Sequence, residues 1–271
     1  MIQPPEAQLA YLGFQRIPPS PLLRPFVRTY WTFRRQVPLT ELQQEYMHPR
    51  GGYGIVFNFG DALTLDSTVL TDPMFLDGTN TISRKMGFYG TVDVMGISFH
   101  EGSAYPFLTI PLIELSDEIA LLDALQRPVL MRLYARLYDA KTLDARIALI
   151  EAWLFERLKL GKLSDPLVPA SLELIRQTEG IASIAGLADR LAISQRQLER
   201  LYHIQVGMTP KQYAGLVRVE AARLRLKAGG LPSMAYLAAD LGFYDQSHFI
   251  REFRAVIGLT PHRYMQRSQA R

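Results

Sequence analysis

The stretch ADLGFYDQSHFIREFR, residues 239–254, decides how the last third of this 271-residue chain folds. A short helix can end before Gly242, a residue that tolerates the positive φ of a tight turn. Asp245 can then cap a second helix, in which Phe249 and Phe253 recur at helical spacing on the inward face. The pattern of helix, tight turn and helix predicts a helix-turn-helix unit.

The same unit occurs twice in the C-terminal part. The segment LADRL (residues 187–191) returns as LAADL (237–241), and GMTPKQY (207–213) returns as GLTPHRY (258–264). The first pair is offset by 50 residues and the second by 51, and the one-residue difference falls in the turn between two short helices. Because self-similarity at a fixed offset marks a repeated supersecondary unit, we expect two helix-turn-helix units.

The first copy carries its own helix-start signals. Ser183 can cap one helix, and Ser194 with Gln197 has the capping-box spacing that opens the next. Leu198 and Leu201 lie on the inward face of that second helix. The first copy therefore predicts the same helix order as the second.

A connecting helix is predicted between the two units. Thr209-Pro210 can begin it, and Gly229-Gly230 with Pro232 can end it after about Ala228. Its expected inner face is Tyr213, Leu216 or Val217, Glu220 or Ala221, and Leu224. At ~1.5 Å per residue this helix is roughly 27 Å long. The second helices of the two units could then enter successive major grooves, ~34 Å apart, on one face of a DNA duplex.

Charge is unevenly distributed along the chain. Residues 1–179 hold 17 Lys and Arg against 20 Asp and Glu, a net of −3, whereas residues 180–271 hold 13 against 6, a net of +7. A basic part attached to an acidic part is expected where only the basic part meets the phosphates of nucleic acid. A solvated charged surface would show the same balance, so charge alone leaves both interpretations open.

The C-terminal sequence resembles the AraC/XylS family of bacterial transcription regulators. The resemblance rests on residues 239–254 and 258–264 and covers about residues 180–267 without a break. It implies a DNA-binding domain with two helix-turn-helix units that binds promoter DNA to regulate transcription, often as an activator, with RNA polymerase as an implied partner.

The outward faces of the two second helices are the expected DNA-reading surfaces. Helical geometry and the resemblance select the same side chains, namely Arg196, Glu199, Arg200, Gln246, Ser247, His248, Ile250 and Arg251. Arg can bond guanine, Gln can bond adenine, and Ile250 could touch a thymine methyl group. Arg200 and Arg251 could instead hold phosphates, which position a protein without specifying sequence. Glu199 could instead pair with Arg196 or His203, and Ile250 could pack partly in the core.

Residues 1–165 predict strands followed by helices. Residues 53–60 alternate, with Tyr53, Ile55, Phe57 and Phe59 on one face. Residues 91–100 predict a second strand, whose apolar phase changes near Gly96, as at a bulge or a barrel corner. Further short strands between about residues 26 and 107 favour a small barrel or sandwich.

Helices are expected between about residues 115 and 160. Pro128 can open one helix through Tyr138, and Thr142 can cap another through Leu160. The apolar face of the second helix either covers the strands or pairs with its twin in a homodimer. Residues 161–166 are the expected linker, so we place one domain at residues 1–165 and the DNA-binding domain at residues 166–271.

The front part resembles, more weakly, an uncharacterised amino-terminal domain found on a subset of these regulators. The similar segments are residues 26–31, 96–102 and 111–115. We therefore expect an α+β chain with two domains. The first is a divergent cupin-like β-barrel with helices, and the second is an all-α domain in which a central helix joins two helix-turn-helix units.

The front domain is expected to sense a small-molecule effector. A hollow barrel lined by Phe57, Phe59, Phe88 and Phe99 would suit an apolar or aromatic molecule, although the same residues would equally make a filled core. A rival hypothesis makes this domain only a dimerisation or protein-partner module. A metal-dependent cupin enzyme is a distant alternative, because only His48, His100 and carboxylates such as Glu101 are available as ligands.

Several function classes are not expected. The chain has no cysteine, which excludes a disulfide framework, a zinc-thiolate site and a thiol nucleophile. No phosphate-binding loop, dinucleotide fingerprint or nucleophile elbow is present, so neither an enzyme nor a cofactor is predicted. No apolar run approaches the ~20 residues of a membrane span, and the first residues lack a signal-peptide pattern. The expected location is the cytoplasm.

Overall fold

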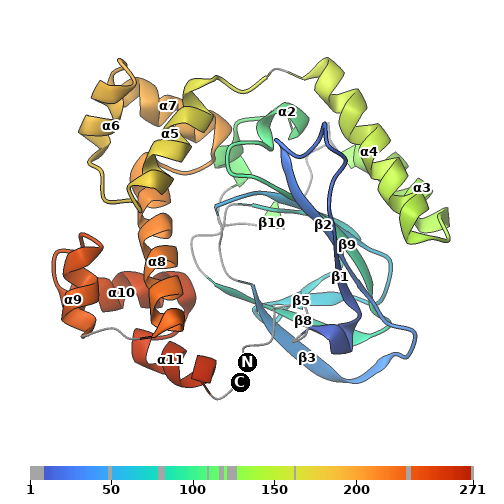
Figure 1. The fold of residues 1–271 in the computed structure, drawn as a ribbon. Coiled ribbons are helices and arrows are strands. Elements are labelled where there is room, and N and C mark those ends of the chain that lie inside the picture. Colours follow the sequence, from blue (N-terminus) through green and yellow to red (C-terminus); the bar gives the residue numbers. More distant parts are fainter. Residues whose placement is uncertain are drawn as a thin grey trace.

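The computed structural model describes residues 9–47, 51–78, 83–108, 110–115, 119–120, 127–161, 163–229 and 233–269. Its front part is built on two antiparallel sheets (Figure 1). The large sheet has the order β1-β2-β9-β4-β7-β10 and the small sheet the order β3-β8-β5-β6. The strands are β1 (Phe14–Ile17), β2 (Val27–Arg34), β3 (Leu39–Met47), β4 (Gly54–Asn58), β5 (Leu63–Leu65), β6 (Thr68–Leu70), β7 (Met74–Asp77), β8 (Arg84–Gly90), β9 (Asp93–Phe99) and β10 (Ile119–Ala120).

The two sheets face each other across a shared apolar core. Val56 and Val94 of the large sheet lie in one cluster with Leu65 and Phe88 of the small sheet. Closure into a barrel would require the outermost strands to pair, whereas β1 and β10 are edges among the described residues. The α+β fold with a helical C-terminal part is confirmed. The closed barrel is not found, and the sandwich that the same strand pattern allowed takes its place.

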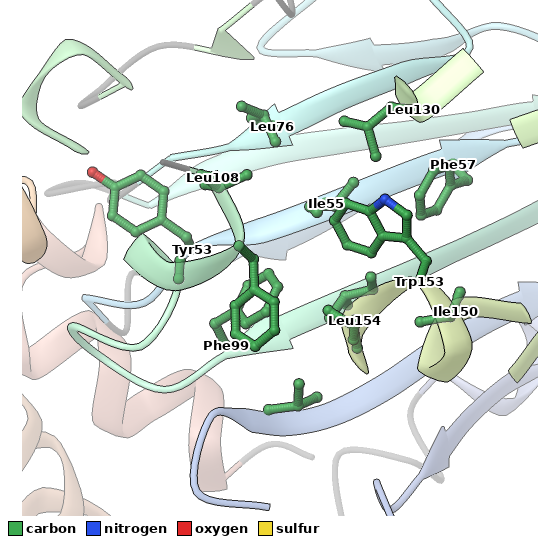
Figure 2. Packing of buried hydrophobic residues seen from close by; sticks show 14 of the residues in the cluster. Tyr53, Ile55, Phe57, Leu76, Phe99, Leu108, Leu130, Ile150, Trp153 and Leu154 are labelled. Carbon is green, nitrogen blue, oxygen red and sulfur yellow. The ribbon is translucent and has the colours of Figure 1, made fainter. Parts of the chain in front are cut away.

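Strand β4 is buried on both faces because helices cover the side of the large sheet that faces away from the small sheet. All five of its residues are buried. Val56 points into the core between the sheets. Ile55 and Phe57 point the other way, into a cluster with Ile150 and Trp153 of a covering helix (Figure 2). The predicted alternation is confirmed, since Tyr53 and Phe59 also belong to this second cluster.

The irregularity expected near Gly96 lies instead in the neighbouring strand. β9 pairs with β2 in continuous register through Gly96, and the shift falls between Val27 and Thr29 of β2. Gly96 is required for a different reason: a Cβ there would lie 2.2 Å from the ring of Trp31. The side chains of β9 alternate normally, but both faces are apolar, which produced the false change of phase.

Five helices of different lengths are described in the front part in addition to the strands. They are η1 (Ala10–Leu12), α2 (Tyr105–Leu108), η2 (Leu112–Leu115), α3 (Arg127–Asp139) and α4 (Leu143–Leu160). Thr142 caps α4 as predicted, because its side chain accepts a hydrogen bond from the Ala145 amide. Ile150 and Leu154 of α4 are fully buried against the large sheet. The apolar face of α4 therefore covers the sheet, one of the two roles that the sequence left open.

The C-terminal part is helical and surrounds α8, with one pair of short helices at each end (Figure 1). Two apolar clusters lie here, one around the first pair and one around the second. The helices are α5 (Leu167–Gln177), α6 (Ile184–Arg190), α7 (Gln195–Gln205), α8 (Pro210–Ala228), α9 (Met234–Asp240), α10 (Gln246–Ile257) and α11 (Pro261–Gln269).

No helix among the described residues combines the length and apolar character of a membrane span. No group of three or more metal-ligating side chains converges in the same part of the chain. His48, as well as the Gly230 and Pro232 stop signals, lies outside the described residues.

Candidate nucleic-acid interface

The two helix-turn-helix units share one turn conformation. Ser183 and Ser233 cap α6 and α9 at equivalent positions, each accepting from a backbone amide three residues on. Ala192 and Gly242, 50 residues apart, both take a positive φ, of 54° and 70°. Glycine adopts this conformation without steric cost, whereas alanine must accommodate its Cβ. The two copies of the predicted repeat thus have the same helix caps and the same positive φ at the equivalent turn position.

The second unit has one extra residue in its turn. Ile193 and Phe243, which follow the positive-φ residues, make equivalent backbone hydrogen bonds to the preceding helices at an offset of 50. The next N-caps are Ser194 and Asp245, at an offset of 51. The inserted residue is therefore Tyr244, whose side chain is 92% exposed. Sequence reasoning did not include Tyr244 among the candidate surface residues of this unit, although the change of offset was the signal that could have found it.

Helix α7 presents one apolar face and one charged face. Leu198, Leu201 and Tyr202 are buried in the cluster around the first unit. The predicted readers Arg196, Glu199 and Arg200 are all exposed. The sequence also allowed an ion pair within the helix from Glu199 to Arg196 or His203, and none of these residues forms one among the described part of the chain. The three readers therefore lie free on one surface.

Helix α10 is built in the same way but with fewer free side chains. Phe249 and Phe253 are fully buried, while Gln246, Ser247 and Arg251 are exposed. Ile250 is half-buried and packs at the edge of the cluster around the second unit. This position leaves it available for an apolar contact only on its outer side.

His248 has partners inside the protein. Its Nδ1 accepts a hydrogen bond from the Tyr244 amide at 3.2 Å. Its Nε2 lies 3.1 Å from Glu252 Oε1, one helical turn away. Both ring nitrogens are thus engaged at the start of α10. A base contact by His248 stays a prediction, and it would require one of these bonds to be exchanged.

Helix α8 serves both units, and this explains why its inner face was only partly predicted. Tyr213 and Leu216 pack with the first unit, whereas Val219, Ala222 and Leu226 are buried with or near the second. Because the two units contact different sides of the helix, the buried residues do not follow a single stripe. Leu224, predicted to face inward, is 53% exposed.

Two arginines of α8 join the first unit to the second. Arg225 pairs with Glu179 of the loop before α6 and with Asp240 at the end of α9. Arg218 donates to the Gly180 carbonyl at 3.2 Å and lies 3.7 Å from Glu252 of α10. We call Arg218 and Arg225, with these partners, the arginine latch. The latch ties the two units together through α8 and limits their relative rotation.

The ion pairs of α8 also affect the charge that the surface presents. Three of the six acidic residues in 180–271 pair with arginines of α8: Glu220, Asp240 and Glu252. Arg196, Arg200 and Arg251 make no ion pair within the described part of the chain. Half of the carboxylates in this part are therefore neutralised by arginines of α8, and the unpaired arginines lie on the outward faces of α7 and α10.

The front part contacts both units without covering these faces. Near the first unit, Glu101 lies 2.5 Å from Arg28 and 3.5 Å from Arg176 of α5. Arg176 also donates to the Tyr213 hydroxyl at 3.2 Å. Burial, with the nearby Glu101 carboxylate, raises the pKa of Tyr213 to about 12, so this hydroxyl stays neutral at physiological pH.

The contact with the second unit is made by backbone and hydroxyl groups. The Ser83 amide and hydroxyl both donate to the Val256 carbonyl near the end of α10, at 2.9 and 2.8 Å. Val256 lies away from the exposed residues at the start of that helix. The front part thus contacts both units and leaves the exposed residues of α7 and of the start of α10 uncovered.

The phenylalanines suggested as effector-lining residues lie in packed clusters. Phe57 and Phe99 are buried between the large sheet and its helices, and Phe88 is buried between the sheets. Phe59 stacks on Tyr134 with ring centroids 5.2 Å apart. This arrangement matches the filled core that the sequence also allowed, and an effector-binding role for these residues stays a prediction.

Two family models match separate parts of the chain. Residues 187–267 match a helix-turn-helix domain, and residues 15–120 match a domain of unknown function (DUF6597). The chain therefore joins a domain of the second kind to a helix-turn-helix domain of the first kind. The resemblance to AraC-type regulators is confirmed by the named relatives.

The relatives are transcription regulators from several bacteria. The chain is 31% identical over 103 residues to the regulator CdhR of Pseudomonas aeruginosa, covering 38% of this chain and 30% of that protein. It is 36% identical over 76 residues to the transcriptional activator RhaS of Escherichia fergusonii, covering 28% and 27% of the two chains. Less than a third of either relative is thus matched.

A solved structure of an AraC-type DNA-binding domain protein from Chromobacterium violaceum is 26% identical to this chain. It matches 38% of this chain and 92% of its own length, with a TM-score of 0.36.

Proposed function

We propose that this chain is a sequence-specific DNA-binding transcription regulator that reads promoter DNA with α7 and α10. The observation that carries the proposal is the pair of equivalent helices, each with unpaired arginines on its exposed face, held on one helical spacer. The spacer has 19 residues, roughly 27 Å at the usual helical rise. That length suits two reading helices about one turn of DNA, ~34 Å, apart.

The side chains divide into base readers and backbone contacts by their chemistry. Arg196, Arg200 and Arg251 suit guanine, and Gln246 suits adenine. Tyr244, exposed beside the start of α10, suits a hydrogen bond from its hydroxyl to a phosphate. This division gives each half of the site a polar reader, with backbone contacts that set its register.

The finer assignments rest on the resemblance and on the arrangement of the parts. An activator role is supported by the relative named as a transcriptional activator. The front part, which we place at residues 1–165 ahead of a DNA-binding domain at 166–271, senses a small molecule and acts through its contacts with both units. Promoter DNA and RNA polymerase are the partners, and the cytoplasm is the compartment where they meet. A homodimer would need a surface other than the apolar face of α4.

The test is selection of duplexes from a random pool by the purified full chain, followed by affinity measurements at several salt concentrations. We expect one enriched motif with two half-sites about one helical turn apart. Affinity should fall by about 10³-fold between about 50 and 200 mM salt, because bound cationic side chains release counterions from DNA. A pool without enrichment, or an affinity insensitive to salt, would contradict the proposal.

The arginine latch provides a further prediction. Arg225→Met removes the pairs with Glu179 and Asp240 and lets the two units rotate against each other. Because a charge-assisted pair contributes about 1.5 kcal/mol, we expect roughly tenfold weaker binding to the two-half-site duplex. Binding to a duplex with one half-site should be unchanged.

Lys227→Met is the matched control for the latch. It removes one positive charge from the same helix at an exposed position. Fluorescence anisotropy with both duplexes would measure all variants. Equal losses in the two variants would mean that Arg225 acts only through its charge.

A further inference from the structure

An open cleft of about 580 Å³ lies at one end of the large sheet, beside the first turn of α4. The cleft is lined by Thr32 and Arg34 of β2, Asp93 of β9 and Arg146 of α4. Arg35, in the connection after β2, also lines it. The junction of α3 with α4 lies on the side of the front part away from α5–α11 (Figure 1). The cleft is therefore separate from the DNA-reading surface and from the contacts between the two parts.

The cleft is positively charged, whereas the part of the chain that contains it is negatively charged overall. Residues 1–179 carry a net charge of −3. The cleft nevertheless gathers three guanidinium groups, of Arg34, Arg35 and Arg146, and one carboxylate, of Asp93. The lining thus has an excess of two positive charges. Like charges gathered in one cleft repel each other unless an anion lies between them.

Arg146 and Arg35 are held in place by hydrogen bonds but keep some of their donors free. Arg146 makes a two-pronged pair with Asp93 at 2.6 and 3.0 Å and donates from Nε to the Leu137 carbonyl. Arg35 donates to the carbonyls of Tyr11 and Val37. A guanidinium group has five donors, so each of these two retains some. Arg34 approaches Asp93 only to 4.0 Å and is half exposed.

We propose that this cleft binds a small hydrophilic organic anion with two negative charges. Arg34 is the cation least committed to the fold, and it meets one negatively charged oxygen of the ligand, while the free Nη donors of Arg146 and Arg35 meet another. Hydroxyl and amide side chains, such as those of Thr32 and Gln15, line the rest, and Leu143 is the one apolar residue among the described residues of the lining. An apolar molecule would desolvate these polar groups without replacing their hydrogen bonds.

Helix α4 connects the cleft to the DNA-binding part. Its 18 residues span about 27 Å, with Arg146 in the first turn and the linker to α5 after the last. Near that far end, Arg157 donates to the Phe107 carbonyl of α2. A ligand that draws Arg34 and Arg146 together would bias the position of α4. This signalling role rests on the proposed function, whereas binding to the cleft does not.

The experiment measures ligand binding to the full chain without DNA, by isothermal calorimetry. The probes are malate as a carboxylate source, glucose 6-phosphate as a phosphate source, and glucose as the neutral molecule matched to the phosphate probe. We expect saturable binding of at least one anion with a dissociation constant below about 10 mM, and no binding of glucose. The anion that binds more tightly identifies the acidic group.

Two variants test the location. Arg34→Gln removes the exposed cation, and Thr91→Glu adds a carboxylate at an exposed lining position. Each variant should weaken binding of the anion by at least about tenfold, which is the effect of losing or opposing one charge-assisted hydrogen bond. Arg132→Gln, which removes an exposed arginine of α3 away from the cleft, should leave binding unchanged.

The outcomes separate the two proposals. Failure of both anions to bind, equal binding of glucose, or equal affinity in Arg34→Gln and Arg132→Gln would overturn the site. Selection of a DNA motif would be unaffected by any of these results. Anion binding that changes no DNA affinity would leave the site standing and remove its signalling role.

Discussion

Replacing Arg196 and Arg251 together by alanine should reduce affinity for the selected duplex by about 10²- to 10⁴-fold. Each arginine lies exposed on the outward face of a different reading helix and makes no ion pair within the described part of the chain. A base-reading arginine contributes about 1–3 kcal/mol. The two residues lie in separate units without a shared partner, so their losses should add.

The comparison that decides this prediction uses a second duplex of scrambled sequence. Loss on the selected duplex alone would assign both arginines to base reading, whereas equal loss on both duplexes would assign them to phosphates. Arg132→Ala with Arg136→Ala removes the same charge from exposed positions on α3 and should change neither affinity by more than about twofold. Unchanged binding in the Arg196 and Arg251 variant would exclude the proposed interface.

The helix-turn-helix repeat was accessible from sequence because its determinants are local. Ser183 caps a backbone amide three residues away, and Gly242 supplies the positive φ of its own turn. Such signals depend on neighbours within one helical turn, so they can be read from a short stretch of sequence. The presence of the same signals in two copies strengthens the prediction. Tyr244 was missed because the sequence alone does not show which residues of the two turns are equivalent. Only the structure shows that Phe243 matches Ile193 and that the inserted residue is Tyr244.

Features that depend on distant partners were not accessible. The need for Gly96 comes from Trp31, 65 positions away, which occupies the space of its missing side chain. Whether strands close into a barrel or stack as two sheets likewise depends on which edges pair, and both arrangements have the same alternation. The arginine latch is of this kind, since Arg225 and Glu179 are 46 residues apart.

The candidate binding residues of the front part illustrate the same division. Buried phenylalanines were predicted as cavity walls because composition cannot distinguish a wall from a filled core. The cleft found in the structure is lined by polar side chains from β2, β9 and α4, which meet only when the sheet and its covering helix are assembled. No segment of the sequence contains enough of these residues to form a motif.

Arg146→Ala should destabilise the front part by about 3–5 kcal/mol, the usual cost of removing one partner from a buried ion pair. The Arg146 side chain is 6% exposed and that of Asp93 is 18% exposed. The substitution also removes the Nε bond to Leu137 and the cation that lies 4.1 Å from the centroid of the Phe59 ring. Among the described residues, Asp93 would keep only the distant Arg34 as a counter-charge.

Both tryptophans of the chain, Trp31 and Trp153, belong to the front part, so their fluorescence during urea unfolding reports on this region. Arg146→Lys keeps the charge but loses the planar fork, and it should recover only part of the stability. The double variant Asp93→Asn with Arg146→Met should be more stable than Arg146→Ala, because no buried charge is left without a partner. If the double variant were as unstable as Arg146→Ala, the loss would reflect packing around Phe59, and the ion pair would not be what holds α4 on the sheet.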